Sequence, residues 1–202
     1  DVGFLPAMLR RRLDRHGRMA LHTAWHCAAG MDSLPFVFAS RHGDLERTLE
    51  LLTALGNQDV LSPTSFSLSV HNSTAGLFSI ARSDRAPATA LAAGADTLGM
   101  SLLEGASMVA AGAERVLVCY ADDTVPGCYA PYVEADPARH PFSVSLLLTR
   151  DEATVNCRLT RHAGEADEAP ETALMRFLVE ERASSVIGVD QHWRLEREPH
   201  AG

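Results

Sequence analysis

The sequence predicts an α/β fold in which helices cover both faces of a mixed sheet. Two of the strand candidates, residues 115–121 and 142–149, are continuous apolar runs, which is typical of strands buried on both faces. Helical patterns alternate with the strand candidates, as they do in layered α-β-α structures. A chain of 202 residues with 46% hydrophobic and 22% charged residues is long enough for one such domain with a sizeable core.

The first elements follow from apolar periodicity and from residues that begin or end helices. Residues 5–29 carry apolar side chains at helical spacing, and this helix is expected to end at Gly30. Residues 34–40 form a short apolar run after a turn and predict a buried strand. Residues 44–55 predict an amphipathic helix with Asp44 as its N-cap.

The middle of the chain predicts a helix, a turn, a strand and a second, buried helix. Pro63 fits the first position of a helix, where a missing N–H loses no hydrogen bond, and this helix is expected to include Phe78. The turn is predicted over residues 83–87 and the strand over residues 88–93. Residues 95–111 predict a helix rich in alanine and glycine, which a neighbouring sheet can approach closely.

The last quarter of the chain predicts less regular structure. A strand is expected over residues 154–160, an acidic loop over residues 163–170 and a helix over residues 171–182. Residues 193–197 are expected to belong to a polar tail. The segment beyond residue 150 therefore has room for only a strand and a helix.

A set of short motifs lies between residues 62 and 104. They are Ser62-Pro63, Asn72, Ala75-Gly76, Ser79-Ile80 and Pro87. This pattern resembles the core of the β-ketoacyl synthases, condensing enzymes of the thiolase-like superfamily, although Ala86 stands where that family usually has glycine. The resemblance is strongest over residues 8–150. It implies that residues 1–202 form a single domain, equivalent to the N-terminal half of a thiolase-like enzyme.

The resemblance also identifies the position of a missing nucleophile. The family places a cysteine eight residues after the turn proline, and this chain has Ala95 there. A catalytic thiolate at a helix N-terminus accepts the acyl chain, and a methyl group cannot. Gly94 and Asp96 cannot replace it, and Thr97 would need an activating base that the sequence does not supply. The family's two catalytic histidines lie in a second half that this chain has no room for, so we expect no catalysis by the chain alone.

The residues expected at an acyl pocket or subunit interface are also taken from the resemblance. They are Ser40, His42, Ser65, Phe66, His71, Asn72 and Thr97. In the family, the loop matching residues 40–45 closes the bottom of the acyl tunnel, and His42 occupies its middle position. A loop histidine is also commonly a surface or capping residue. His71 and Asn72 could equally be satisfied buried polar groups with a structural task.

Charge restricts the possible partners. A net charge of −8 argues against nucleic acid, and the absence of lysine among the 18 basic residues excludes Schiff-base and P-loop lysine chemistry. Arg10, Arg11 and Arg12 form either a solvated basic face or a docking patch for an acidic partner, which the resemblance implies to be an acyl carrier protein. His22 and His26 share a helix face, but no third ligand is apparent, so neither a metal nor a cofactor is expected.

The remaining features predict a cytoplasmic protein without a membrane span. The four cysteines show no C-x-x-C spacing and predict buried, reduced thiols rather than a disulfide scaffold. No apolar run approaches the roughly 18 to 20 residues that a spanning helix needs. The residues given include no recognisable signal peptide.

These observations favour a non-catalytic subunit of the chain-length-factor type. Such a subunit would form a heterodimer with a cysteine-bearing ketosynthase in polyketide, aryl polyene or fatty-acid-like chain elongation. Two alternatives stay open. One is a weak acyltransferase or thioesterase that uses Ser73 or another hydroxyl, although no Gly-x-Ser-x-Gly motif is present. The other is a homodimeric acyl-binding protein.

Overall fold

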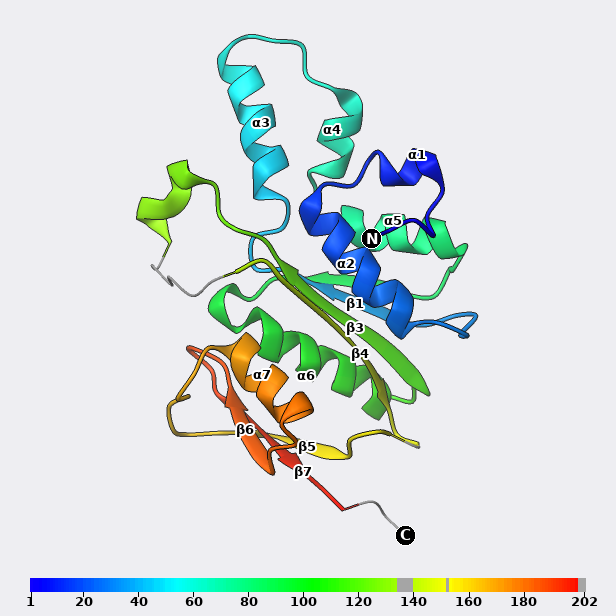
Figure 1. Ribbon diagram of the computed structural model, residues 1–202, viewed down its shortest axis with the longest axis vertical. Coiled ribbons are helices and arrows are strands. Elements are labelled where there is room, and N and C mark those ends of the chain that lie inside the picture. The colour runs from blue at the N-terminus through cyan, green and yellow to red at the C-terminus, as the bar shows by residue number, and fades with distance from the viewer. Residues whose placement is uncertain (134–139, 152, 200–202) are drawn as a thin grey trace.

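The protein is built around a four-stranded mixed sheet with the strand order β2-β1-β3-β4 (Figure 1). The computed structural model describes residues 1–133, 140–151 and 153–199. Strand β1 (Phe36–Ala39) pairs in parallel with β2 (Ala88–Leu91) and with β3 (Arg115–Asp122), and β4 (Phe142–Thr149) pairs antiparallel to β3. The mixed sheet expected from the sequence is therefore confirmed.

Helices cover both faces of this sheet, and the alternation of side chains along β1 explains how. Phe36 and Phe38 face α2 (Arg15–Cys27) and α5 (Ser73–Arg82), while Val37 and Ala39 face the opposite layer. In that second layer, α6 (Thr97–Ala110) packs against β3 and α7 (Pro170–Val179) lies beside it (Figure 1). The single core expected from composition is therefore two cores, one on each side of the sheet.

Two of the predicted long helices are each interrupted. The helix expected over residues 5–29 is divided into α1 (Ala7–Arg10) and α2, because Asp14 caps α2 by accepting a hydrogen bond from the Gly17 N–H. The helix expected from Pro63 is divided into α4 (Pro63–Leu68) and α5.

The interruption between α4 and α5 follows from serine chemistry. The Ser69 hydroxyl donates to the Phe66 carbonyl at 2.9 Å, and the Ser73 hydroxyl donates to the Leu68 carbonyl at 2.9 Å. Serine hydroxyls that bond nearby carbonyls compete with the helical hydrogen bonds of the backbone. The start of α4 is as predicted, with Pro63 in the first turn and Ser62 as the N-cap.

Helices α3 (Leu45–Gly56) and α4 form an arm that extends from the body of the molecule (Figure 1). Asp44 caps α3 by accepting a hydrogen bond from the Arg47 N–H, as the sequence predicts. Neither helix contains a fully buried residue. The apolar side of the amphipathic α3 is therefore only partly covered, and Leu52 and Leu55 are exposed.

The C-terminal region holds more structure than the sequence predicts. A second sheet has the order β5-β7-β6, with antiparallel pairs throughout. Its strands are β5 (Cys157–Arg161), β6 (Ser184–Ile187) and β7 (Trp193–Arg197). The prediction of a polar tail at residues 193–197 is wrong, because Trp193 and Leu195 turn inward onto the second core while their polar neighbours face outward.

The nucleophile region and the cysteines also differ in detail from expectation. The strand expected to reach residue 93 ends at Leu91, and a 3₁₀ turn over Gly94–Asp96 precedes α6. All four cysteines are free, as expected, but Cys128 and Cys157 are exposed rather than buried. Among the described residues, no helix is long and apolar enough to cross a membrane.

The close approach of α6 to the sheet gives a test of the fold. A β-carbon added at Gly105 would lie 2.5 Å from Val118 Cγ2 and 2.8 Å from Leu148 Cδ1. Gly105→Ala is therefore expected to lower the free energy of unfolding by about 1–3 kcal/mol through overpacking. Gly76→Ala, in an open helical position of α5, is the matched control and should be neutral or stabilising by up to about 1 kcal/mol. Urea denaturation measures both, and equal values would contradict this packing.

Candidate functional site

The predicted nucleophile position lies in the connection between β2 and α6. Strand β2 leads into the 3₁₀ turn, where Gly94 adopts a φ of +58°, and the turn leads directly into α6. A φ in this region favours glycine. Ala95 lies in the middle of this turn and is half-buried. The connection therefore presents a methyl group next to the N-terminus of α6.

Asp96, the residue after Ala95, forms structural hydrogen bonds through its carboxylate. Asp96 is buried, and its Oδ1 accepts from the N–H groups of Val189 at 2.7 Å and Asp190 at 3.1 Å. Its Oδ2 accepts from the Gln191 N–H at 2.9 Å. One carboxylate thus holds three successive amides of the turn between β6 and β7. We call this contact the Asp96 clamp, and it fixes the C-terminal sheet against the nucleophile turn.

Thr97, the other candidate at this turn, also has a local role. Its side chain is 1% exposed. The hydroxyl oxygen accepts from the Ala93 N–H at 2.9 Å, and the hydroxyl donates to the Gly94 carbonyl at 2.7 Å. The hydroxyl proton is therefore held by the backbone of the turn that precedes α6.

A second group of polar side chains meets where β1 and β3 end. Ser40 donates its hydroxyl proton to Asp122 Oδ1 at 2.9 Å and accepts from the Gly43 N–H at 2.8 Å. The N–H groups of Arg41 and His42 also donate to Asp122 Oδ1, at 2.9 Å and 3.3 Å. Asp122 therefore caps the loop that follows β1.

This group contains serine, histidine and aspartate, but it is not arranged as a catalytic triad. His16 Nε2 lies 3.1 Å from the Ala121 carbonyl oxygen and 3.2 Å from Ser40 Oγ. A carbonyl oxygen only accepts hydrogen bonds, so Nε2 carries the proton and cannot also receive one from Ser40. A triad needs a histidine nitrogen that accepts the serine proton. All three side chains are buried, which is consistent with a structural network.

Tyr120 extends this network to α7. Its hydroxyl lies 2.7 Å from Asp122 Oδ2 and 2.7 Å from Glu171 Oε1. Burial, together with these two carboxylates, raises the pKa of Tyr120 far above its ordinary value. The phenol therefore remains a hydrogen-bond donor between the sheet and α7.

Comparison with known proteins identifies the family. The model of the β-ketoacyl synthase N-terminal domain matches residues 1–194. The chain belongs to this family. A search of curated proteins finds no match.

Solved structures give the same answer for the fold. A chain of the structure described as ketosynthase (ApeO) in complex with its chain length factor (ApeC), from Xenorhabdus doucetiae, is 29% identical, with a TM-score of 0.82. The match covers 96% of the present chain and 82% of that chain. The fold is therefore one thiolase-like half, as the sequence resemblance implies.

Two more distant structures share only the fold. The ishigamide ketosynthase/chain length factor is 19% identical with a TM-score of 0.61, over 88% of this chain and 56% of that one. A β-ketoacyl synthase from Burkholderia phymatum is 16% identical with a TM-score of 0.61, over 88% of this chain and 55% of that one. The chain spans about half the length of these two ketosynthase-family chains.

The pocket residues predicted from the ketosynthase resemblance lie in three places. Ser40, His42 and His71 lie together, because His71 Nε2 is 2.8 Å from the Ser40 carbonyl oxygen. Ser65 and Phe66 lie on the arm, with Phe66 64% exposed. Asn72 is exposed and makes no capping hydrogen bond to α5, and Thr97 lies buried at the separate nucleophile turn described above.

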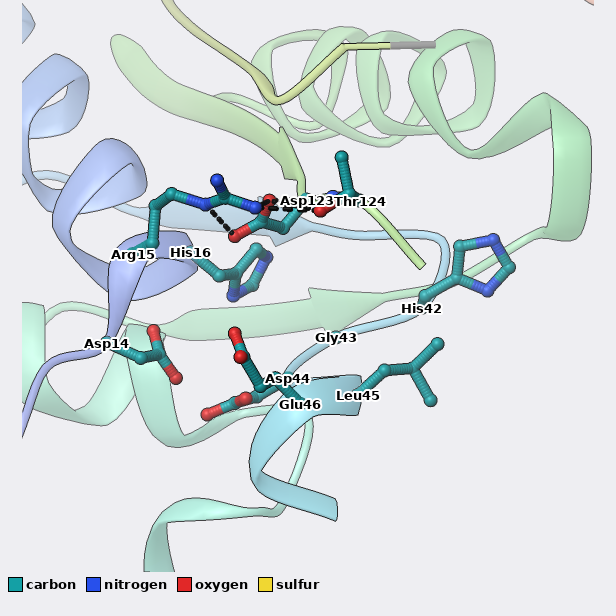
Figure 2. A pocket seen from close by; sticks show the side chains of 10 residues that line it. All are labelled: Asp14, Arg15, His16, His42, Gly43, Asp44, Leu45, Glu46, Asp123 and Thr124. Carbon is teal, nitrogen blue, oxygen red and sulfur yellow. Dashed lines mark hydrogen bonds and ion pairs between the residues drawn. The ribbon is translucent and has the colours of Figure 1, made fainter. Parts of the chain in front are cut away.

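His42 faces a shallow pocket near the start of the arm. Figure 2 shows its ring at one end of this pocket and Arg15 and His16 at the other. Arg15 Nε donates to Asp123 Oδ2 at 2.8 Å, so this guanidinium is paired. Of the Asp122-Asp123 pair at the end of β3, one carboxylate thus caps a loop and the other binds an arginine.

Two N-cap carboxylates meet at the same pocket. Asp44 Oδ2 accepts from Arg47 Nε at 2.6 Å, and Arg47 Nη2 reaches Asp14 Oδ2 at 3.1 Å. Burial and the neighbouring Asp14 raise the pKa of Asp44 to about 6, whereas hydrogen bonds to Asp44 and Gly17 help to lower that of Asp14 despite its burial. The pKa values of the two carboxylates therefore shift in opposite directions, although both carboxylates bind Arg47.

The basic patch lies at the end of α1. Arg11 and Arg12 are exposed and Arg10 is half-exposed. Within residues 1–133, 140–151 and 153–199, none of these three guanidinium groups forms an ion pair with a carboxylate.

The sequence did not identify Asp96, Tyr120, His16 or Glu171 as structurally important. Their partners lie far away in the chain, and the Asp96 clamp joins residues 93 to 95 positions apart. The one signal in the sequence that could have pointed to this network is the Asp122-Asp123 pair at the end of an apolar strand, where a carboxylate can cap the following loop.

The Asp96 clamp gives a prediction about stability. Asp96→Ala removes a buried carboxylate that accepts hydrogen bonds from three N–H groups, so we expect the free energy of unfolding to fall by about 1.5–3 kcal/mol. Amide hydrogen exchange should accelerate at residues 189–191. The exposed Asp190→Ala is the matched control and should change stability by less than about 0.5 kcal/mol. Unchanged exchange at residues 189–191 in Asp96→Ala would contradict the clamp.

The raised pKa of Asp44 gives a prediction about pH. Between its ordinary pKa of 3.8 and its folded value of about 6, the folded chain binds more protons at Asp44 than the unfolded chain does. This contribution to stability is complete below pH 3.8 and is lost as the pH rises through about 6. Asp44→Asn keeps a capping oxygen but does not titrate, so it should gain stability relative to the wild type between pH 4 and pH 7, by at most about 2 kcal/mol. Denaturation curves at these two pH values measure the difference in the free energy of unfolding. The same change between pH 4 and pH 7 in both proteins would contradict the raised pKa of Asp44.

Proposed function

We propose that this chain is a non-catalytic, chain-length-factor-type subunit that pairs with a cysteine-bearing ketosynthase. The observation that carries the proposal is the nucleophile turn with Ala95 in its middle and the Asp96 clamp beside it. The connection from strand to turn to helix is present, but the side chain at the position that matches the family's nucleophile is a methyl group. A subunit of this kind contributes surface and pocket walls rather than a reacting group.

The hydroxyl groups considered as substitute nucleophiles support the same proposal. Ser40 donates to Asp122, Thr97 donates to Gly94, and Ser73 donates to the Leu68 carbonyl at 2.9 Å. A serine or threonine nucleophile needs a base that accepts its proton in a position to react. Each of these protons is instead held by a structural acceptor, which makes acyl transfer or thioester hydrolysis the weaker hypothesis.

Two exposed features provide a surface for the ketosynthase partner. Strand β2 is an edge of the sheet, and along its outer side no strand of the described residues pairs with it. Unpaired edge strands readily bind another chain. Beside β2, α5 exposes Ile80 by 64%, and the arm carries further exposed apolar side chains. These are Leu52, Leu55, Val60, Phe66 and Val70.

The similarity to the ApeO–ApeC structure supports a ketosynthase as the occupant of this surface, rather than a second copy of the chain. In the proposed heterodimer, His42, Ser65 and Phe66 would contribute to the wall of the partner's acyl tunnel. Arg10, Arg11 and Arg12 would attract the acidic acyl carrier protein, since their guanidinium groups are exposed or half-exposed at the end of α1. The pathway would be aryl polyene or related polyketide chain elongation.

Co-purification tests the pairing. The chain is expressed together with the ketosynthase encoded beside it, and light scattering measures the mass of the complex. We expect a stable one-to-one complex. Ile80→Arg should abolish it, because a charge would be buried at the interface, whereas Val179→Arg on α7 should leave it intact, since Val179 is 70% exposed on the other side of the sheet. A homodimer that ignores every ketosynthase would refute the heterodimer.

Product analysis tests the pocket separately. With a complex in hand, His42→Ala should change the length of the acyl chain that the ketosynthase produces, because it alters the space at the proposed end of the tunnel. Mass spectrometry of the products measures this change. Asn72→Ala serves as the comparison, since Asn72 belongs to the same group of predicted pocket or interface residues and has an exposed side chain. Unaltered product length with His42→Ala would remove His42 from the tunnel without affecting the pairing.

A further inference from the structure

Two histidines lie side by side on the outer part of α2, away from the nucleophile turn. His22 and His26 are one helical turn apart, with ring centroids separated by 4.4 Å and ring planes inclined by 58°. His26 is exposed and His22 is half-buried. Side chains four residues apart lie on the same face of a helix. The pair has no part in the proposed ketosynthase pairing.

Each ring has one nitrogen held by a backbone carbonyl. His22 Nδ1 lies 2.7 Å from the carbonyl oxygen of Asp1, and His26 Nδ1 lies 2.7 Å from the carbonyl oxygen of His22. Because a carbonyl oxygen can only accept, both Nδ1 atoms carry the proton. In the neutral rings, both Nε2 atoms therefore present a lone pair.

The two Nε2 atoms are available to a ligand. Neither forms a hydrogen bond to any residue in the described part of the chain. Partial burial lowers the pKa of His22, and the positive charge of a protonated His26 acts in the same direction.

We propose that His22 and His26 chelate one late first-row divalent cation, such as Zn²⁺, through their Nε2 atoms. Metal-binding histidines commonly donate their other ring N–H to a carbonyl or carboxylate, which fixes the tautomer and the ring orientation. Both rings already have this arrangement. Imidazole nitrogens select zinc, copper or nickel over magnesium and calcium, which prefer oxygen.

The expected coordination leaves open positions. Among the described residues, no group of three or more histidine, cysteine, aspartate or glutamate side chains could hold a metal. The absence of a third ligand led the sequence interpretation to expect no metal here. Two protein nitrogens can still bind Zn²⁺ at about 2.0–2.1 Å while water fills the other positions, as open zinc sites keep at least one water ligand. Such a site is weaker than a closed structural one and exchanges its ion more readily.

Calorimetric titration with Zn²⁺ tests this site on the full chain, treated with a chelator and purified without a histidine tag. We expect one Zn²⁺ per chain. His22→Gln and His26→Gln should each weaken binding at least about tenfold, because either change converts a chelate to a single ligand. His140→Gln, at an exposed histidine outside α2, is the matched control and should bind as the wild type does.

Binding should also weaken in acid, because protonated imidazole has no lone pair for the metal. Thermal unfolding of each variant without metal checks that it folds. Undetectable Zn²⁺ binding by the wild type would overturn the proposal. Equal binding by the wild type and the His22→Gln, His26→Gln double variant would also overturn it, since the ion would then lie elsewhere.

Discussion

The buried carboxylate of Asp122 holds the centre of the structure together. It accepts from the Ser40 hydroxyl, from the Arg41 N–H at the start of the next loop, and from the Tyr120 hydroxyl. A buried carboxylate is tolerated only where hydrogen bonds replace its hydration, and these donors, together with the His42 N–H, meet that need here. The ends of β1 and β3, the position of His42 and, through Tyr120, the placement of α7 all depend on this one group.

Asp96 is a second buried carboxylate that anchors backbone, in this case the backbone of the C-terminal sheet. By binding three amides of the β6–β7 turn, it makes the nucleophile turn a junction between two parts of the domain. An active condensing enzyme must leave this turn accessible to an acyl thioester. Under the proposed non-catalytic role, Ala95 needs no such access, and the neighbouring Asp96 carboxylate can serve as a structural anchor.

The sequence was sufficient wherever structure depends on neighbouring residues. The apolar runs gave the central strands, and Asp44 and Pro63 gave the starts of α3 and α4. It was insufficient where a side chain forms a hydrogen bond with the backbone and so interrupts a helix that the apolar pattern predicts. Asp14 and Ser69 are the two examples. Strand β7 was missed although its inward and outward residues alternate, because charged side chains outnumber the apolar ones. The family was predicted correctly from the motif, whereas the contacts of Thr97 and His71 required three-dimensional information.

The arm exposes apolar surface that the proposed partner subunit would cover. A helix of 12 residues, the length of α3, is only marginally stable in water without tertiary contacts. Neither α3 nor α4 buries a residue fully, yet the arm carries exposed leucine, valine and phenylalanine side chains. Covering these side chains would stabilise the arm by about 25 cal/mol for each Å² of apolar surface removed from water. The same contact would place Phe66 and Ser65 against the other subunit. Assembly and formation of the acyl pocket would therefore be one event, in which the partner orders the surface that shapes its own tunnel.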